Sequence, residues 1–443
     1  MIPIAAGSVE GVTLRSGDPL RVIDRVTIDS RAAKPGALFI ALEGTRVDGH
    51  DFLADVIAAG CAAVLCRPNR CESQAGVAVL EADEPLVAFG VLARQVRRGF
   101  GGKVIGVAGS NGKTSTKDIL AALCSQATPT LATHANFNNR LGVPLTLVDL
   151  ETTHGVCVCE LGTSEFGELA DLCAIAEPDI GIITNIGPEH LEFLGDLDGV
   201  AREEASLISA LHAGADVVLP AHEPRLDAYR RTDLRTTTFG LEADADVRVV
   251  STEDGTIVLA AFGHELRFET ALCAPHQALN VAAATAAALR LGIPAETLPD
   301  AASSIALSPR RGQEQQRAAG GLVINDAYNA NPGSVRTALA SLVTRAAGRR
   351  TVAVLGHMAE LGPESARWHY DVGLAARALG VDLVVAVGLY AEDTAAGAGT
   401  RSQICADNAA AAVALVTLVR PGDVVLLKGS RSSAIWELEE AVS

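Results

Sequence analysis

Short apolar runs recur along the whole chain, and each ends in glycine or in a polar residue. In the first hundred residues RVTIDSR, ALFIAL and AAVLCR predict short strands, and DFLADVIAAG predicts a helix that Gly60 ends. Further along, KVIGVAG, GVCVCELG, DIGIITNIG and DVVLPAH predict four buried strands. The alanine-rich run over 280–292 predicts a helix with Gly292 just past its end.

The last third of the chain repeats this alternation of strands and helices. GLVINDAYNANP, TVAVLGHMAELG, LVVAVG and DVVLLKGSRSS each read as a buried strand that runs into a polar loop. Strands that alternate with helices predict parallel sheets covered on both faces. We therefore expect an α/β protein of three domains: a small α/β domain over 1–98, a central parallel-sheet domain over 99–311 and a Rossmann-like domain over 312–443.

The polar residues follow the strands, which is where open parallel sheets bind their ligands. Two sheets that face each other in this way would enclose a site between the second and third domains. The length of 443 residues fits three domains, and a hydrophobic content of 49% is enough for several cores.

Charge and cysteine usage narrow the class of protein. The net charge of −17 argues against a general nucleic-acid binder, which would show a basic face. No apolar stretch is long enough to span a bilayer, and MIPIAAGSVEGVTL lacks the features of a signal peptide, so we expect a cytoplasmic protein without membrane insertion. The nine cysteines form no CxxC pair, which favours buried, reduced thiols.

The loop GSNGKTS (109–115) follows the strand KVIGVAG and precedes a helical pattern. Backbone N–H groups in such a loop, together with the N-terminus of the helix, cradle an anion. Lys113 would reach a terminal phosphate, and the Thr114 hydroxyl would bind Mg²⁺. The common phosphate-loop pattern has a glycine five positions before Gly112, and this chain has Val107 there.

Glu160 and His190 follow two other buried strands of the same predicted sheet. A carboxylate beside a nucleotide phosphate can hold Mg²⁺, and an imidazole could join a second metal or act as a base. A histidine in GPEH is by itself more often structural, but its place beside the phosphate loop favours a functional role. In AREEAS, Glu203 fits a solvated helix face.

Two turns of the third domain carry further polar residues. Asp326, Asn329 and Asn331 lie in NDAYNANP, where a plain turn explains much of the pattern. Lys428 and Arg431 lie in LLKGSRSS, which could bind an anion or a carboxylate or could be a simple helix cap. Lysine is rare among the 36 basic residues, and Lys113 and Lys428 both follow apolar strands, so these sites are expected to need a compact point charge.

Taken together, these motifs resemble the Mur ligases, the ATP-dependent amino-acid-adding enzymes of bacterial peptidoglycan synthesis. IDSRAAKPGALFIALEGTRVDGHDF is similar to their N-terminal uridine-binding module. GSNGKTSTKD followed by ANFNNRLGVPLTL is similar to the central ATPase domain of the MurF type. DAYNANPGSV, VLGHMAELGPES and LLKGSRS are similar to its C-terminal domain, and YNANP with LGxMxELG separates it from the MurE type.

The resemblance implies a reaction and its partners. A substrate carboxylate attacks the γ-phosphate of ATP, and the amine of D-alanyl-D-alanine then attacks the resulting acyl phosphate and expels phosphate. The implied substrates are UDP-N-acetylmuramoyl-tripeptide and D-alanyl-D-alanine, the cofactors are ATP and Mg²⁺, and the enzyme is expected to be a cytoplasmic monomer. The third residue of the acceptor is left open between diaminopimelate and lysine.

The resemblance also assigns residues. The ATP-binding residues are Gly109, Ser110, Asn111, Gly112, Lys113, Thr114, Ser115, Gln277, Asn280, Arg311 and Asp326. The Mg²⁺ ligands are Thr114, Glu160, His190 and Glu204. The catalytic residues are Lys113, Glu160, His190 and Glu204. The substrate-binding residues are Ser30, Arg31, Asn139, Asn329, Asn331 and Lys428.

Several positions depart from the family pattern. Gln277 stands where the family motif HNxxN has its first asparagine, Asn325 replaces the first acid of a DD pair, and His357 replaces the aspartate of LGDM. The largest departure is Glu204, which aligns with a lysine that is carbamylated in the family. No lysine occurs from Asp118 to Leu427, so we hypothesise that Glu204 itself supplies the carboxylate that binds the second Mg²⁺.

Two other readings compete with this one. A phosphate-loop switch protein would need a base-reading NKxD element, which the chain lacks, and would leave two further domains unexplained. A sibling ligase, of the MurE type or a folylpolyglutamate synthase, would add a different amino acid.

Overall fold

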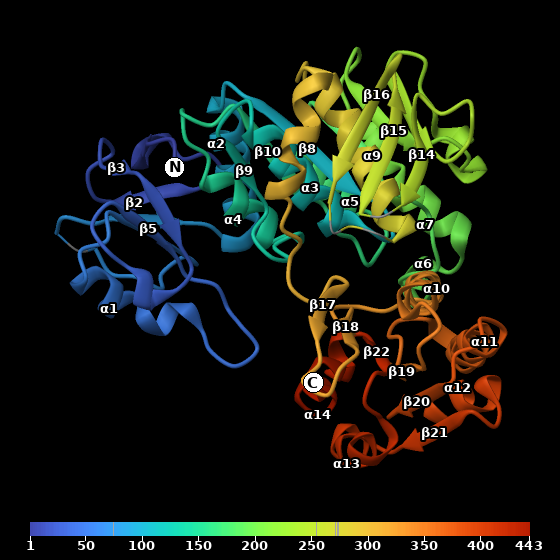
Figure 1. Cartoon of the computed structure of the whole chain (residues 1–443). Coiled ribbons are helices and arrows are strands. Elements are labelled where there is room, and N and C mark those ends of the chain that lie inside the picture. Colours follow the sequence, from blue (N-terminus) through green and yellow to red (C-terminus); the bar gives the residue numbers. More distant parts are fainter. Residues whose placement is uncertain (74, 254, 271, 273) are drawn as a thin grey trace.

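The computed structural model describes residues 1–443 except 74, 254, 271 and 273. Figure 1 shows three lobes along the chain: an N-terminal sheet, a central sheet with helices on both faces, and a C-terminal sheet below the central one. The predicted α/β class with three domains is confirmed.

The N-terminal sheet has five strands in the order β2-β7-β6-β5-β4. Its strands are β2 Thr13–Ser16, β4 Arg25–Thr27, β5 Ala37–Ile40, β6 Ala63–Cys66 and β7 Ala78–Glu81, and β1 Ile4–Ala5 pairs separately with β3 Val22–Ile23. Helix α1 (Leu53–Ala58) confirms the predicted helix, and α2 (Pro85–Gly99) follows the sheet. One apolar cluster continues from this sheet through α2 into the central domain, so the two domains share a core.

The central sheet has nine strands in the order β16-β15-β14-β13-β12-β11-β8-β10-β9. Its strands are β8 Lys103–Ala108, β9 Thr130–Ala132, β10 Val156–Glu160, β11 Ile180–Ile183, β12 Asp216–Pro220, β13 Arg235–Gly240, β14 Val247–Glu253, β15 Thr256–Ala261 and β16 His264–Glu269. The four strands predicted from apolar runs are confirmed by β8, β10, β11 and β12. Because β8 lies between β10 and β11, the loop after β8 has a neighbouring strand end on each side.

One edge of the central sheet differs from the prediction of a wholly parallel sheet. β15 pairs antiparallel with β14 and with β16, which extends the sheet by a meander. β16 alternates the buried Leu266 and Phe268 with exposed polar residues because one of its faces packs on the core while the other faces water, whereas β15 is the mostly buried apolar run TIVLAA.

The C-terminal sheet has six strands in the order β17-β18-β22-β19-β20-β21. Its strands are β17 Gln313–Gln316, β18 Leu322–Asn325, β19 Thr351–Leu355, β20 Leu383–Val387, β21 Ser402–Cys405 and β22 Val424–Lys428. All pairs are parallel except the one between β17 and β18. Parallel strands joined by helices place the ends of β18, β19 and β22 at one edge of the sheet, facing the central domain.

The helices cover both faces of the two larger sheets. In the central domain they are α3 Lys113–Ser125, α4 Gly142–Val148, α5 Glu168–Ala176, α6 Leu191–Leu194, α7 Leu197–Glu204, α8 Ser206–Ala210 and α9 Pro275–Arg290. In the C-terminal domain they are α10 Pro332–Ala346, α11 Ser365–Ala378, α12 Ala391–Ala398, α13 Asn408–Leu418 and α14 Glu439–Val442. Short 3-10 helices are η1 Ala6–Ser8, η2 Ser30–Ala32, η3 Gly49–Phe52, η4 Pro224–Tyr229, η5 Ala295–Ser304, η6 Gly362–Glu364, η7 Arg431–Ser433 and η8 Ile435–Leu438.

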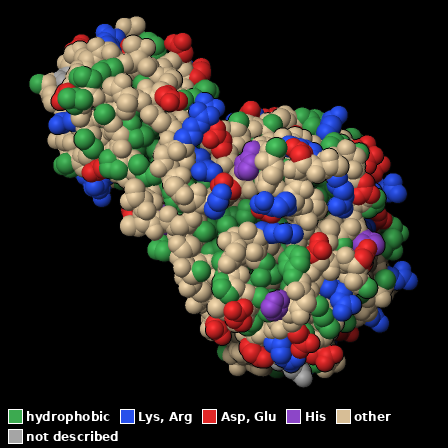
Figure 2. Space-filling view, turned by 90° about the horizontal axis from the view of Figure 1, so that it is seen from above, with side chains coloured by type: hydrophobic (Ala, Val, Ile, Leu, Met, Phe, Trp, Pro, Cys, Tyr) green, Lys and Arg blue, Asp and Glu red, His purple; other side chains and the backbone are tan. Residues whose placement is uncertain are grey.

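The surface charges and the cysteines lie as the sequence led us to expect. Figure 2 shows acidic and basic side chains intermingled on the face seen from above, without an extended basic patch there. The eight cysteines that the structure describes are buried and unpaired, and Cys273 lies outside the described residues. Across the described part of the chain, no helix combines the length and apolarity that crossing a bilayer requires.

Candidate active site

The phosphate loop leaves the end of β8 and enters α3, and two glycines shape it. Gly109 has φ 111° and Gly112 has φ 83°, both in the left-handed region that favours glycine. A Cβ at Gly109 would collide with Thr184, and a Cβ at Gly112 would collide with Asn280. The loop therefore needs a glycine at both ends of Ser110-Asn111 and needs none earlier, which explains why Val107 is tolerated.

Lys113 and Thr114 open α3 and face the loop. The Lys113 ammonium donates to the backbone oxygens of Gly109 and Ser110, the latter at 3.3 Å. The Thr114 hydroxyl accepts from Arg311 Nη2 at 2.9 Å, and the Arg311 guanidinium lies 3.9 Å from the centre of the Tyr328 ring. Lys113 is thus held by backbone oxygens, with Glu189 3.6 Å away as its ion-pair partner in the described structure, whereas Thr114 is held by Arg311.

Glu160 ends β10 and lies beside the loop. It is 1% exposed, and its Oε1 accepts from Asn138 Nδ2 at 2.8 Å. Its Oε2 has no hydrogen-bond partner among the described residues. A buried carboxylate oxygen without a partner is a free ligand position beside the phosphate loop.

Glu204, at the end of α7, lies against the start of the loop. It is 1% exposed, and its Oε2 accepts from the Gly109 N–H at 2.6 Å. Its Oε1 is a second buried atom for which the described part of the chain supplies no hydrogen bond. Burial raises the pKa of Glu204 to about 7, although the nearby Lys113 ammonium acts to lower it.

The prediction that Glu203 lies on a solvated helix face was wrong. Glu203 is 2% exposed and accepts from the backbone N–H groups of Gly167 and Leu169, both at 2.8 Å, and from the Thr163 hydroxyl at 3.1 Å. It therefore fastens α7 to the start of α5. The run of charged residues did not indicate this, because the donors come from a loop distant in the chain.

His190 connects the central domain to the C-terminal domain. Its Nδ1 pairs with Glu360 Oε2, and the Glu192 N–H donates to the Glu360 backbone oxygen at 3.1 Å. His190 has φ 50° and Glu360 has φ 61°, so both hold a backbone conformation that non-glycine residues rarely adopt. The His190 Nε2 lies 3.9 Å from Glu189 Oε2, on the side of the ring away from Glu360.

The C-terminal side of the site is built around Lys428, at the end of β22. Its ammonium donates to Asp326 Oδ2 at 2.6 Å and to the Asn329 backbone oxygen at 3.0 Å. Asn331 caps α10 through the Ser334 N–H, and its Nδ2 donates to the phosphate-loop residue Asn111 at 2.8 Å. The turn NDAYNANP therefore both supplies functional groups and contacts the loop across the domain boundary.

These residues surround a cavity of about 1040 Å³ between the two domains. We call it the interdomain cavity. The predicted residues that line it are Ser110, Asn111, Gly112, Lys113, Thr114, Ser115, Asn139, Glu160, His190, Gln277, Asn280, Arg311, Asp326, Asn329, Asn331 and Lys428. Gly109 and Glu204 lie outside its described lining, behind the loop, and Ser30 and Arg31 lie outside it in the N-terminal domain.

Some predicted residues also have structural tasks. Asn139 Oδ1 accepts from the Gly142 N–H at 2.9 Å at the start of α4, and Gln277 Oε1 accepts from the Ala274 N–H at 3.1 Å at the start of α9. Arg31 is held by Asp29 at 2.7 Å, and its side chain is 88% exposed.

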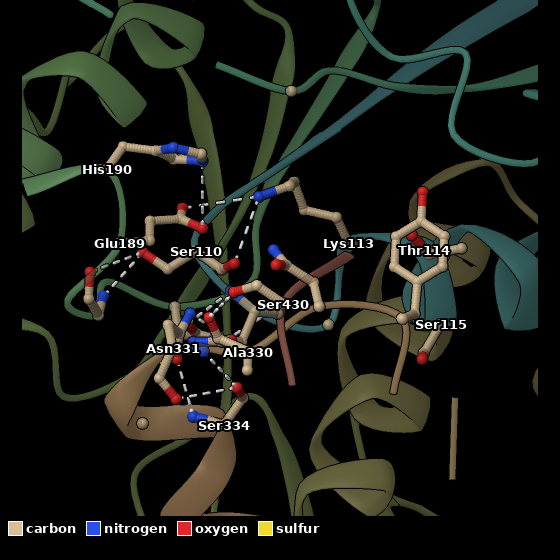
Figure 3. A pocket seen from close by; sticks show the side chains of 18 of the residues that line it. Ser110, Lys113, Thr114, Ser115, Glu189, His190, Ala330, Asn331, Ser334 and Ser430 are labelled. Carbon is tan, nitrogen blue, oxygen red and sulfur yellow. Dashed lines mark hydrogen bonds and ion pairs between the residues drawn. The ribbon is translucent and has the colours of Figure 1, made fainter. Parts of the chain in front are cut away.

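The cavity residues that the sequence analysis did not single out include Asn138, Glu189, Tyr328 and Glu360. Glu189 precedes His190 and is 6% exposed, and its Oε1 lies 3.6 Å from the Lys113 ammonium. Figure 3 shows Glu189 between His190 and Lys113. The position of Glu189 just after a buried strand was a usable signal, but Glu360 and Tyr328 reach the central domain only through the way the domains meet.

The charges of the site act on one another. Burial acts to lower the pKa of Lys113, but the carboxylates of Glu189, Glu204 and Glu160 outweigh it and raise that pKa above its ordinary value. Burial also acts to lower the pKa of His190, and the carboxylates of Glu360 and Glu189 raise it. Burial raises the pKa of Glu189 against the opposing effect of Lys113.

Comparison with known protein families accounts for nearly the whole chain. The Mur ligase family, catalytic domain, matches residues 22–98; the Mur ligase middle domain matches residues 107–288; and the Mur ligase, glutamate ligase domain, matches residues 310–431.

Individual relatives agree with these matches. The UDP-N-acetylmuramoyl-tripeptide–D-alanyl-D-alanine ligase of Mycobacterium tuberculosis is 34% identical over 99% of this chain and 96% of its own length. A crystal structure of MurF from Acinetobacter baumannii covers 95% of this chain and 93% of its own, at 30% identity and a TM-score of 0.87. The MurF ligase of Thermotoga maritima, solved in complex with ADP, covers 94% and 96% at 28% identity and a TM-score of 0.84.

Proposed function

The chain belongs to the Mur ligase family, and from that membership we propose that it joins D-alanyl-D-alanine to UDP-N-acetylmuramoyl-tripeptide. It is an ATP-dependent ligase of peptidoglycan precursor synthesis. The observation that supports the assignment of the site is the interdomain cavity, which brings the phosphate loop of one domain opposite the Lys428 turn of the other. We further propose that the enzyme works as a monomer in the cytoplasm.

The central domain would bind ATP. The loop N–H groups and the N-terminus of α3 would hold the phosphates, and Lys113 would exchange its bonds to the loop's carbonyl oxygens for bonds to the β- and γ-phosphates. Arg311 lies beside Thr114 and would also reach the phosphates. Gln277 and Asn280 would contact the adenine, and Asp326 would meet the ribose.

The residues of the cavity fit a divalent cation. Glu160 lines the cavity with one buried oxygen that has no partner in the described structure, and Glu204 has another behind the loop. Thr114 and Glu160 would hold a first Mg²⁺, and His190 with Glu204 would hold a second. Bound there, Mg²⁺ would neutralise charge on the transferring phosphoryl group and on the attacking carboxylate.

The reaction then has two substitution steps in the interdomain cavity, one at the γ-phosphorus and one at the acyl carbon. An oxygen of the acceptor carboxylate bonds to the γ-phosphorus while the bond to ADP breaks, and Lys113 stabilises the charge that moves to ADP. The amine of D-alanyl-D-alanine next attacks the acyl carbon, phosphate leaves and the amine loses a proton. We propose that Ser30 and Arg31 bind the uridine end of the acceptor, while Asn139, Asn329, Asn331 and Lys428 position the reacting ends.

An assay with defined acceptors tests this function. The purified chain is incubated with ATP, Mg²⁺, D-alanyl-D-alanine and UDP-N-acetylmuramoyl-tripeptide carrying either diaminopimelate or lysine, and phosphate and peptide product are measured. We expect phosphate release that depends on D-alanyl-D-alanine, with one pentapeptide product per phosphate. Absence of product with both tripeptides would overturn the proposal, and product formation only from a dipeptide acceptor and a single amino acid would indicate a sibling ligase.

A further inference from the structure

Three carboxylates near Lys113 each carry a buried oxygen that has no hydrogen-bond partner in the described structure. They are Glu160 Oε2, Glu189 Oε1 and Glu204 Oε1, and the residues are 1%, 6% and 1% exposed. Buried polar atoms of folded proteins are nearly always hydrogen-bonded, so three exceptions in one place indicate a ligand that binds there.

Glu189 is the one of these three to which neither the motifs nor the relatives assign a role. It lines the interdomain cavity, and its two oxygens are directed at the Lys113 ammonium, 3.6 Å away, and at His190 Nε2, 3.9 Å away. Figure 3 shows its carboxylate between these two groups. Both distances exceed a hydrogen bond, so the carboxylate is surrounded by functional groups and bonded to neither of them.

His190 is oriented to share a ligand with Glu189. Its Nδ1 is taken by Glu360 from the other domain, which leaves Nε2 on the side of Glu189. Histidines that bind metals commonly have their second ring nitrogen fixed by a carboxylate in this way. The ring is thus presented to the cavity by a contact that exists only where the two domains meet.

The charge of this cluster is unbalanced. Three buried carboxylates face one lysine and, at longer range, His190 and Arg311, and Lys113 lies no closer than 3.6 Å to Glu189. A buried charge without a bonded partner is costly, because the protein interior cannot replace its hydration. A divalent cation between Glu189 and His190 would supply both the missing charge and the missing bonds.

We propose that Glu189 is a ligand of the second divalent cation, beside His190 and in addition to Glu204. Glu204 approaches from behind the loop with one oxygen already bonded to Gly109, so Glu189 is the carboxylate that faces this cation from within the cavity. The inference rests on the proposed function only for the identity of the reaction; the cation site itself rests on the three carboxylates and on His190.

The test is a titration of Mn²⁺ into the full-length protein without nucleotide, followed by the electron paramagnetic resonance signal of free Mn²⁺. Glu189→Gln keeps the size and hydrogen-bonding capacity of the side chain and removes its charge. We expect it to raise the dissociation constant of a Mn²⁺ site at least about tenfold, since loss even of an outer-shell partner has effects of that size. The control, Glu192→Gln, removes an exposed carboxylate three residues along and should bind Mn²⁺ as the wild type does.

A second variant gives a gain of signal. Glu189→Cys should bind Cd²⁺ and show the ultraviolet charge-transfer absorbance of a cadmium thiolate, because soft cations prefer thiolate ligands. The eight described native cysteines are buried, and the wild type measured in parallel sets their background. Unchanged Mn²⁺ affinity in Glu189→Gln, or no charge-transfer band in Glu189→Cys above the wild-type background, would overturn the inference.

The ligation assay on the same wild-type preparation separates this inference from the proposed function. Wild-type ligation with Mn²⁺ binding unaffected by Glu189→Gln overturns the role of Glu189 alone. Wild-type Mn²⁺ binding that Glu189→Gln weakens, without any ligation of D-alanyl-D-alanine, supports the cation site and overturns the proposed function instead.

Discussion

Two lysines follow buried parallel strands and face each other across the interdomain cavity, yet their surroundings differ. Lys428, after β22, donates to Asp326 at 2.6 Å and to the Asn329 backbone oxygen at 3.0 Å. Lys113, in the loop after β8, is bonded to backbone oxygens of its own loop, and the carboxylate that pairs with it in the described structure, Glu189, is 3.6 Å away. The charge of Lys428 is paired within its own domain, whereas the carboxylates beside Lys113 keep oxygens that no described residue satisfies.

The adjacent residues Glu203 and Glu204 repeat this difference over one peptide bond. Glu203 has three donors and fastens α7 to the start of α5. Glu204 has one donor and one oxygen that none of the described residues satisfies. Burial and charge alone therefore do not mark a functional residue; the unsatisfied hydrogen-bonding capacity of a buried group does.

The largest effect is expected from Lys113→Met. Removal of the point charge that would stabilise the transferring phosphoryl group should lower kcat/KM for ATP on the order of 10²–10³-fold. The measurement is phosphate release under steady-state conditions. Lys103→Met is the control, because that ammonium pairs with Asp179 at 3.0 Å on an exposed side chain and should leave turnover intact. A loss smaller than about tenfold would mean that Lys113 is not the phosphate ligand.

Glu204→Ala should have the next largest effect, a loss on the order of 10²-fold in kcat, since loss of metal-bound positioning costs at least this much. Wild-type activity should also be the same in CO₂-free buffer, because a glutamate needs no carbamylation. Glu203→Gln is the comparison for the neighbouring residue. It should lower the free energy of unfolding and leave the Mg²⁺ dependence of the remaining activity unchanged. Wild-type activity in Glu204→Ala, or activity that falls without CO₂, would contradict this role.

For Lys428→Met we expect a loss of acceptor positioning and also a loss of stability, about 2 kcal/mol in the unfolding free energy of the C-terminal domain. Breaking a buried pair leaves one uncompensated charge, and the 23% exposure of the Asp326 side chain reduces the cost through solvent screening. Urea unfolding measures the change, and the surface pair broken in Lys103→Met should cost less than about 1 kcal/mol. Equal losses in the two variants would show that Lys428 is not a structural ion pair.

The smallest effect is expected from Glu360→Gln, which weakens the contact that orients His190 from the other domain. We expect the Mg²⁺ concentration for half-maximal activity to rise about tenfold, with kcat at saturating Mg²⁺ largely preserved. Glu364→Gln, in an exposed pair with Arg367 at 3.7 Å, is the matched control. An unchanged Mg²⁺ requirement would show that His190 keeps its orientation without Glu360.

Much of this architecture could be predicted from the sequence because buried parallel strands are short, continuous apolar runs. β8, β10, β11, β12, β18, β19, β20 and β22 were all predicted in this way. The antiparallel edge over β15 and β16 was missed: β16 shows only weak alternation because one of its faces is exposed, and the apolar run of β15 was not singled out.

Site residues whose position depends on a neighbouring strand could be predicted, and those whose position depends on distant segments could not. The phosphate loop follows β8, Glu160 ends β10 and His190 lies in the loop after β11, so their place in one cavity followed from the topology. Glu203 was misjudged and Glu360 was missed because their partners lie in segments far along the chain. Such contacts depend on how helices and domains pack, which no local pattern encodes.

In the proposed reaction, ATP activates a substrate carboxylate in the interdomain cavity. This step is tested with UDP-N-acetylmuramoyl-tripeptide labelled with ¹⁸O in its terminal carboxylate, by mass spectrometry of the phosphate released during ligation to D-alanyl-D-alanine. Each phosphate should carry one ¹⁸O atom taken from the acceptor, because the amine displaces that oxygen together with the phosphoryl group. Peptide product accompanied by unlabelled phosphate would contradict this step.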